Sequence, residues 1–461
     1  MQTASSFFEE ELSSINLNDA RLNKRAFKIG DNLLSNPGSC IQSLTDDKNE
    51  ARCPYDFFSN PKVNWMHLLL PHRQSTLQRI SSNSSEHIYI IQDSTFYNYT
   101  SHTAKVDLGV IGKQGSHIQL GLMQHTSFCV DSNDIPLGIL ELDFMGYEDS
   151  QKYSSHRSDF EAIASSRWRR FVSQNIKELK DNKYKQKVIL LCDREADFFE
   201  LHNDLRHGDL KFIIRCKYIN RPTGKSARAR KNRITELLKK QFPLGRTIIE
   251  LTHPKTHKEY SSSFTMKSLE NVLIPPVHRG ANHRQNKLDP VKMNIVEVSN
   301  DDLSWLLLTN LPVKTFNQVR FVIESYKKRW HIETFHKVLK TAYDADKIYL
   351  HHSRDAIQNL LTMINIAAYQ TYYLISQSRL DVPILAKEMF SIEEIQAVNV
   401  YFSSNINDIP TLKEFYAMVV KLGGHKNERN KHPPGILVIY RGIKKLNHIT
   451  QMYKVMMSSK T

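Results

Sequence analysis

Three acidic residues stand where carboxylates could act together on a phosphate ester. Asp93 ends the apolar run "IYIIQD", Asp193 ends the similar run "VILLCD", and Glu333 belongs to the charged stretch "YKKRWHIETFHKVLK". Short apolar runs of this kind predict buried strands, and sites in open α/β sheets gather at the carboxyl ends of strands. An aspartate after a strand is also a common turn residue. The presence of a third carboxylate on a helix favours a site.

These carboxylates indicate a hard cation. Without cysteine or clustered histidine beside them, they favour Mg²⁺, with Mn²⁺ as a substitute, over zinc. Two such ions roughly 3.5–4 Å apart can activate an attacking oxygen and stabilise the leaving oxygen in phosphoryl transfer. The sequence therefore predicts a two-ion site held by Asp93, Asp193 and Glu333.

The stretch around Glu333 predicts one amphipathic helix. At ~100° per residue, four polar side chains fall within an arc of roughly 60° on it. They are Tyr326, Arg329, Glu333 and Lys340. A solvated surface face would show the same pattern. The alternative is a phosphate-binding face, in which Arg329 makes a bidentate contact with DNA phosphate.

Composition describes a globular, basic protein. The 461 residues are 40% hydrophobic and 24% charged, which excludes a disordered chain, and the net charge is +15. Basic excess of this size attracts polyanions, but it does not separate DNA, RNA and anionic membranes.

Two further features bear on location. The five cysteines are scattered without zinc-finger spacing, which favours a reducing cytoplasm and no structural zinc. The N-terminus lacks the order of a signal peptide, and the apolar stretch from Leu360 is interrupted by Asn365 and Gln370. That stretch predicts a buried core helix rather than a membrane span.

The chain divides into three predicted parts: a helical domain at 1–75, a mixed α/β domain at 76–375 and a helical domain at 376–461. A β-rich insertion is predicted at about 218–300. In the first part, a helix carries a basic face that is either solvated or in contact with DNA, made of Arg21, Lys24, Arg25 and Lys28. Residues 215–240, beginning with Arg215, hold ten Lys/Arg against one Glu. This run is either a disordered basic loop or a phosphate contact.

Taken together, the motifs resemble the DDE transposases of bacterial insertion sequences. The signature Y-x2-R-x3-E-x6-K at 326–340, "CDREAD" at 192–197 and "IQDST" at 91–95 are similar to insertion-sequence family four, the branch of the transposon-five transposase. Looser similarity covers "DARLNKR", "YDFFSNPKV", "WLLLTNLPV" and "KEFYAMVVKLGG". One departure is "TAYDAD" after Lys340, where the family commonly has a Gly-containing segment.

The resemblance implies an RNase H-like core in which Asp93, Asp193 and Glu333 bind metal, and Tyr326, Arg329 and Lys340 contact phosphates of double-stranded DNA. It implies cut-and-paste chemistry through a hairpin, performed by a homodimer in the bacterial cytoplasm at the nucleoid. It also implies that the C-terminal domain serves dimerisation. Trp305, assisted by Trp330, would receive a flipped base; the alternative for Trp305 is core packing. Two rival functions stay open: an endonuclease without strand transfer, and a non-catalytic DNA-binding descendant.

Overall fold

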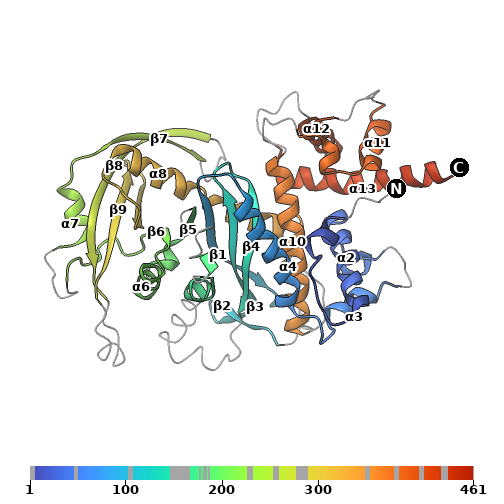
Figure 1. The fold of residues 1–461 in the computed structure, drawn as a ribbon, viewed down its shortest axis with the longest axis horizontal. Helices are drawn as coiled ribbons and strands as arrows, with labels where there is room; N and C mark the ends of the chain where they lie inside the picture. The colour runs from blue at the N-terminus through green and yellow to red at the C-terminus, as the bar shows by residue number, and fades with distance from the viewer. Residues whose placement is uncertain are drawn as a thin grey trace.

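A computed structural model gives the fold of the chain (Figure 1). It describes residues 6–45, 50–101, 107–145, 167–175, 178–179, 184, 187–225, 232–252, 259–276, 289–347, 353–377, 384–403, 410–426 and 434–459. Within these residues one ten-stranded sheet, with helices packed against it, forms a mixed α/β fold. The predicted fold class is confirmed in this respect.

The half of the sheet that carries the aspartates combines antiparallel and parallel pairing. Its strands are β1 (Ile88–Asn98), β2 (Gly109–Gln114), β3 (His117–Asp131), β4 (Pro136–Met145), β5 (Val188–Cys192) and β6 (Lys211–Arg215). β3 pairs antiparallel with β1, β2 and β4. β1, β5 and β6 run parallel to one another. β5 is buried along its whole length, which explains its unbroken apolar sequence.

The β-rich segment continues the same sheet. Its strands are β7 (Gly245–Thr252), β8 (Glu259–Ile274), β9 (Val291–Ser299) and β10 (Ser304–Thr309). β10 pairs with β6 on one side and β9 on the other, and β8 and β7 follow outward. In Figure 1 these strands and α7 (Ile234–Lys239) lie at the opposite end of the molecule from the chain termini. The β-rich segment therefore extends the sheet outward from β6.

Two long helices cover the β4 side of the sheet. α4 (Trp65–Ser82) and α10 (Arg354–Gln377) contact each other and β4 (Figure 1). α10 is buried along most of its length, which confirms the predicted core helix. Its Asn365 exchanges two hydrogen bonds, both 2.9 Å long, with the Gln124 amide on β3, so neither buried amide is left unsatisfied. No helix within the described ranges is long and apolar enough to cross a membrane.

The remaining N-terminal and C-terminal helices lie beyond α10. The N-terminal ones are α1 (Phe7–Glu11), α2 (Ala20–Ser35) and α3 (Cys53–Phe58), and the C-terminal ones are α11 (Ile392–Tyr401), α12 (Leu412–Leu422) and α13 (Ile436–Ser458). α10 contacts α2 and α3 directly, and α13 also contacts α2. The predicted domain limits at residues 75 and 375 fall inside α4 and α10. These two helices therefore span the predicted limits.

A buried ionic cluster fixes α1 to α4. The Glu11 carboxylate accepts hydrogen bonds from His72 and from both terminal nitrogens of Arg79, while Arg79 also donates to the Leu137 carbonyl. Burial raises the pKa of Glu11, but His72 and Arg79 outweigh burial and hold it at about 2. Because burial lowers the pKa of His72, the neutral ring donates through Nδ1 to Glu11 and accepts through Nε2 from the Ile139 amide. Arg79 is therefore the charged partner of Glu11.

Replacing Glu11 by glutamine is expected to lower the free energy of unfolding on the order of 3 kcal/mol at pH 7, because Arg79 loses its buried counter-charge. The difference from wild type should be full above pH 4.5 and vanish as the pH falls through 2, since the folded protein holds the carboxylate ionised down to that value. Urea unfolding at pH 7 and pH 3 measures both. The control is Glu50→Gln, which removes an exposed pair with Lys28. Equal losses for the two variants at pH 7 would contradict the prediction.

Candidate active site

Strand register brings the two aspartates together. β1 and β5 pair in parallel with Gln92 opposite Cys192, so the next residues, Asp93 and Asp193, are neighbours at the same end of the pairing. Asp193 directly follows β5, as predicted, and its Oδ1 accepts the Glu195 amide at 2.8 Å to start a short 3₁₀ turn. Asp93 lies within β1, because pairing with β3 continues to Asn98. Asp93 therefore lies beside the end of β5 but within β1, which continues beyond it.

Glu333 comes from the second of two helices. The predicted single helix is divided into α8 (Phe316–Lys327) and α9 (Trp330–Thr341). At the junction, backbone hydrogen bonds run to the third preceding residue: Lys328 to Ser325, Arg329 to Tyr326 and His331 to Lys328. Such bonds wind the chain more tightly than an α-helix. The single straight helix of the prediction was therefore wrong at this point.

Arg329, at the start of α9, joins two of the carboxylates. Its Nη1 donates to Asp93 Oδ2 at 3.1 Å, and its Nη2 donates to Glu333 Oε1. The Arg329 side chain is only 15% exposed, so its charge and that of Asp93 interact with little solvent screening. The structure thus places Asp93, Arg329 and Glu333 in one chain of contacts, with Asp193 on the adjacent strand.

Burial and the neighbouring charges shift the pKa values of both aspartates. Burial, followed by the field of Asp193, raises the pKa of Asp93 to about 6; Arg329 lowers it and Glu333 raises it. Burial likewise raises the pKa of Asp193. Partly buried carboxylates that repel one another are typical of functional sites, and a bound cation would relieve the repulsion.

The donors suit a hard cation by type. They are carboxylate oxygens, as Mg²⁺ prefers. In the described part of the chain, however, no three acidic, histidine or cysteine side chains are close enough to hold an ion as they stand. Arg329 lies between Asp93 and Glu333. A cation at this site therefore competes with the guanidinium for both carboxylates.

The other two signature residues are Tyr326 and Lys340. Tyr326 is buried rather than on a wet face, and its hydroxyl has no hydrogen-bond partner among the described residues. The Lys340 ammonium lies 5.9 Å from the centre of the Tyr97 ring. Burial, then Lys340 and Arg329, lowers the pKa of the buried His336 to about 3, so this ring is neutral and lies in the field of both cations. Lys340 and Arg329 therefore both act electrostatically on His336.

Two tryptophans and Arg215 occupy different positions. Trp305, on β10, stacks on Phe264 with ring centres 6.3 Å apart and is partly buried against the core. Trp330, at the start of α9, is 67% exposed. Burial, then Arg194, lowers the pKa of Arg215 at the end of β6; Arg329 adds to this effect. Because Ile214 pairs with Cys192 in the parallel β5–β6 register, Arg215 lies at the same end of the sheet as Asp193.

The basic face of α2 lies away from the carboxylates. α2 contacts α10 on the far side from the sheet (Figure 1). Lys24 is exposed, and Arg25 is half-buried. Arg21 pairs with Asp19, and Lys28 pairs with Glu50. The structure therefore does not bring this face together with the signature residues.

Sequence reasoning missed Arg167. Its Nε donates to Ser94 Oγ at 2.9 Å, and its Nη2 donates to Glu195 Oε2. The same hydroxyl contacts His125 Nδ1 at 2.9 Å. Arg167 therefore links the residue after Asp93 to the "CDREAD" turn. The only local sequence signals were Ser94 after Asp93 and Glu195 close to Asp193. Neither of them indicates which arginine would bind there.

Two family models match the chain. Residues 4–63 match a transposase DNA-binding domain, and residues 162–369 match a transposase DDE domain. The second match includes Asp193 and Glu333, and Asp93 precedes it. These domains define a protein class: nucleotidyl-transfer enzymes that act on DNA. Within this class, the chain belongs to the DDE transposases and has an RNase H-like core.

Proposed function

We propose that this transposase moves its element by cut-and-paste chemistry with Asp93, Asp193 and Glu333 as its catalytic carboxylates. One observation carries the proposal: parallel register sets Asp93 beside Asp193, and Arg329 connects Asp93 to Glu333. This links three acidic residues that are far apart in the sequence. The affiliation with insertion-sequence family four is part of the same proposal and rests on the signature motif.

The three carboxylates would hold Mg²⁺, or Mn²⁺, which supplies charge stabilisation and activation of an oxygen nucleophile when bound. Arg329, Tyr326 and Lys340 then bind and orient the DNA phosphates around the scissile bond. Arg329 has a particular role, because its guanidinium can move from the carboxylates to a phosphate without leaving the site. Arg215 adds positive charge at the same end of the sheet.

The proposed reaction cuts and rejoins DNA in four steps. Water first cleaves one strand at the element's end, and the freed 3′-hydroxyl attacks the opposite strand, which closes a hairpin and releases flanking DNA. A second water then opens the hairpin, and the regenerated 3′-hydroxyl attacks target DNA. Each attack forms one phosphorus–oxygen bond and breaks another.

End binding and pairing are assigned to the terminal parts. The N-terminal family match and the basic face of α2 support binding of the element's ends, with Arg21, Lys24, Arg25 and Lys28 as phosphate or base contacts. Four exposed apolar side chains near the end of α13 support a homodimer that joins two ends: Met452, Val455, Met456 and Met457. The limits 1–75, 76–375 and 376–461 are retained as the proposed division of labour.

The test is a reconstituted reaction. Purified protein, end-labelled DNA carrying the element's own ends, a supercoiled target and Mg²⁺ should yield nicked, hairpin, excised and joined products in that order. Products that stop at cleavage would identify an endonuclease without strand transfer. Binding without any cleavage would identify a non-catalytic descendant.

Trp305→Ala is expected to leave the first nick nearly normal and to slow hairpin formation by roughly tenfold to a hundredfold, since aromatic stacking contributes roughly 1–3 kcal/mol per base. A hairpin bends the strand sharply, so one base must leave its stack, and the Trp305 ring offers it a platform. A time course that resolves the three cleavage products measures this. Trp305→Phe, which keeps an aromatic ring over Phe264, should recover much of the rate. Equal slowing of all steps with a lower melting temperature would show that Trp305 is only a core residue.

A further inference from the structure

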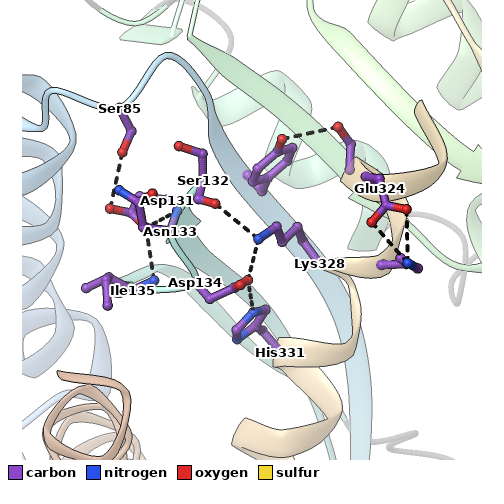
Figure 2. A network of polar contacts seen from close by, with 12 residues as sticks. Ser85, Asp131, Ser132, Asn133, Asp134, Ile135, Glu324, Lys328 and His331 are labelled. Atoms are coloured by element: carbon purple, nitrogen blue, oxygen red, sulfur yellow. Dashed lines mark hydrogen bonds and ion pairs between the residues drawn. The ribbon is translucent and has the colours of Figure 1, made fainter. Parts of the chain in front are cut away.

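The turn between β3 and β4 lies beside α8 and α9 and is held by several hydrogen bonds (Figure 2). Asp131 Oδ1 accepts the amides of Asn133 and Ile135 at 2.8 and 2.9 Å, and its Oδ2 accepts from Asn83 and Ser85. These bonds hold the turn from inside. They leave the next acidic residue, Asp134, free to face outward from the turn.

Asp134 faces the junction of α8 and α9. Its Oδ1 accepts from Lys328 Nζ at 2.6 Å and from His331 Nε2 at 2.7 Å, and Figure 2 shows both side chains converging on it. Lys328 also donates to the Ser132 carbonyl at 3.1 Å. His331 Nδ1 lies 2.6 Å from the Tyr372 hydroxyl of α10. We call Asp134, Lys328 and His331 the Asp134 cluster.

The position of these contacts in the chain is significant. Lys328 and His331 lie on either side of Arg329 and Trp330 in the sequence. The Asp134 cluster therefore holds both ends of the tight turn from which Arg329 extends to Asp93. Short 3₁₀ stretches within helices are often hinges. Here the hinge has an external attachment to the same sheet that carries Asp93, because β3 pairs with β1 across Asp93.

We infer that Asp134 is a positioning residue for the proposed reaction: through Lys328 and His331 it fixes the angle at which α9 presents Arg329 and Glu333 to Asp93. This inference rests on the proposed function of those carboxylates. The Asp134 carboxylate binds Lys328 and His331 rather than those carboxylates, so it acts through the junction. No residue of the predicted signature motif performs this task.

The cluster is suited to fix direction more than to add stability. The Asp134 side chain is 54% exposed, and ion pairs at such sites contribute little to the free energy of unfolding. The side chains of its partners Lys328 and His331, in contrast, are only 19% and 15% exposed, so they have few alternative positions. Burial raises the pKa of Asp134, but its hydrogen bonds with His331 and Lys328 leave it lower than usual, which keeps the acceptor ionised at neutral pH.

Backbone geometry supplies a clean variant. Asp134 has φ +67°, in the left-handed region that glycine adopts without cost. Asp134→Gly therefore removes the carboxylate while it relieves the backbone, and Asp134→Asn keeps a short side chain whose amide oxygen can still accept. The matched control is Glu324→Gln, which removes the Lys327 pair of α8, a pair that does not reach the turn.

The experiment measures single-turnover nicking at saturating DNA, affinity for the ends, melting temperature and amide hydrogen exchange at residues 328–333. Asp134→Gly is expected to slow nicking about tenfold, because small misplacement of reacting groups is costly. Exchange at the junction should accelerate, while affinity stays within about twofold and the melting temperature within about 2 °C. Asp134→Asn should recover most of the rate, and Glu324→Gln should match wild type.

Three outcomes would overturn the inference. Wild-type nicking and unchanged exchange in Asp134→Gly would make the cluster an ordinary surface contact. A fall in nicking that merely follows a fall in melting temperature would make it structural. Slowing by Glu324→Gln to the same extent would make the effect nonspecific. Glu333→Gln, measured alongside, tests the proposed function separately: if it nicks normally, that function fails, and the exchange data still decide whether Asp134 holds the junction.

Discussion

Replacing Asp93, Asp193 or Glu333 by alanine is expected to abolish nicking and joining, with a loss of at least about 10³-fold in rate, which corresponds to roughly 4 kcal/mol of transition-state stabilisation. Each carboxylate is expected to contribute charge that no neighbour can replace, because Asp93 and Asp193 lie on adjacent strands and Arg329 connects Asp93 to Glu333. Affinity for the ends should stay within about twofold, since Lys and Arg contacts to phosphate dominate binding.

The same DNA substrate gives both measurements: gel-shift affinity without metal, and product formation after Mg²⁺ is added. Asp204→Asn provides a matched control, because it removes a carboxylate of the same domain that pairs with Arg169 on the surface. Wild-type nicking by any of the three alanine variants would remove that residue from the site. Loss of end binding together with nicking would instead indicate a folding defect.

Arg329→Ala is expected to separate rate from metal requirement. The nicking rate should fall roughly 10²–10³-fold, because one preorganised donor to the reacting phosphate is lost. The Mg²⁺ concentration needed for half-maximal rate should nevertheless decrease, since the guanidinium no longer competes for Asp93 and Glu333. A slower reaction that nevertheless needs less Mg²⁺ follows from the position of Arg329 between the carboxylates.

A titration of nicking rate against Mg²⁺ at fixed ionic strength tests this result. Arg329→Lys serves as the comparison: it keeps one charge but cannot span two carboxylates, so its metal requirement should lie between those of wild type and Arg329→Ala. If Arg329→Ala needed more Mg²⁺ than wild type, the guanidinium would be organising the metal site rather than competing with it.

Sequence reasoning succeeded where local pattern and structure coincide. The runs before Asp93 and Asp193 are buried strands because apolar, β-branched residues there must leave water. The apolar stretch from Leu360 forms a core helix, and its Asn365 is satisfied by Gln124. The proximity of Asp93 and Asp193 also followed from the position of each after an apolar run, because the carboxyl ends of parallel strands lie at the same edge of a sheet.

The remainder depended on contacts between distant segments. A helical repeat cannot reveal that the signature stretch is tightened at Lys328, since the residues there are ordinary helix formers. Arg167 and Asp134 were missed because their partners are far away in the sequence; Asp134 meets Lys328 across 194 positions. Tyr326 was expected on a wet face because the helix was read without the sheet that covers it.

The continuity of the sheet from β6 through β10 to β7 also limits how this protein could be shortened or rearranged. β10 shares backbone hydrogen bonds with β6 and with β9, so removal of the added strands would turn it into an open edge, a template for pairing with other chains. Trp305 lies on that shared strand. We therefore expect β9, with β8 and β7 outside it, to shield β10 from such pairing, so a shortened version of the enzyme must keep β9 or replace it with another cover.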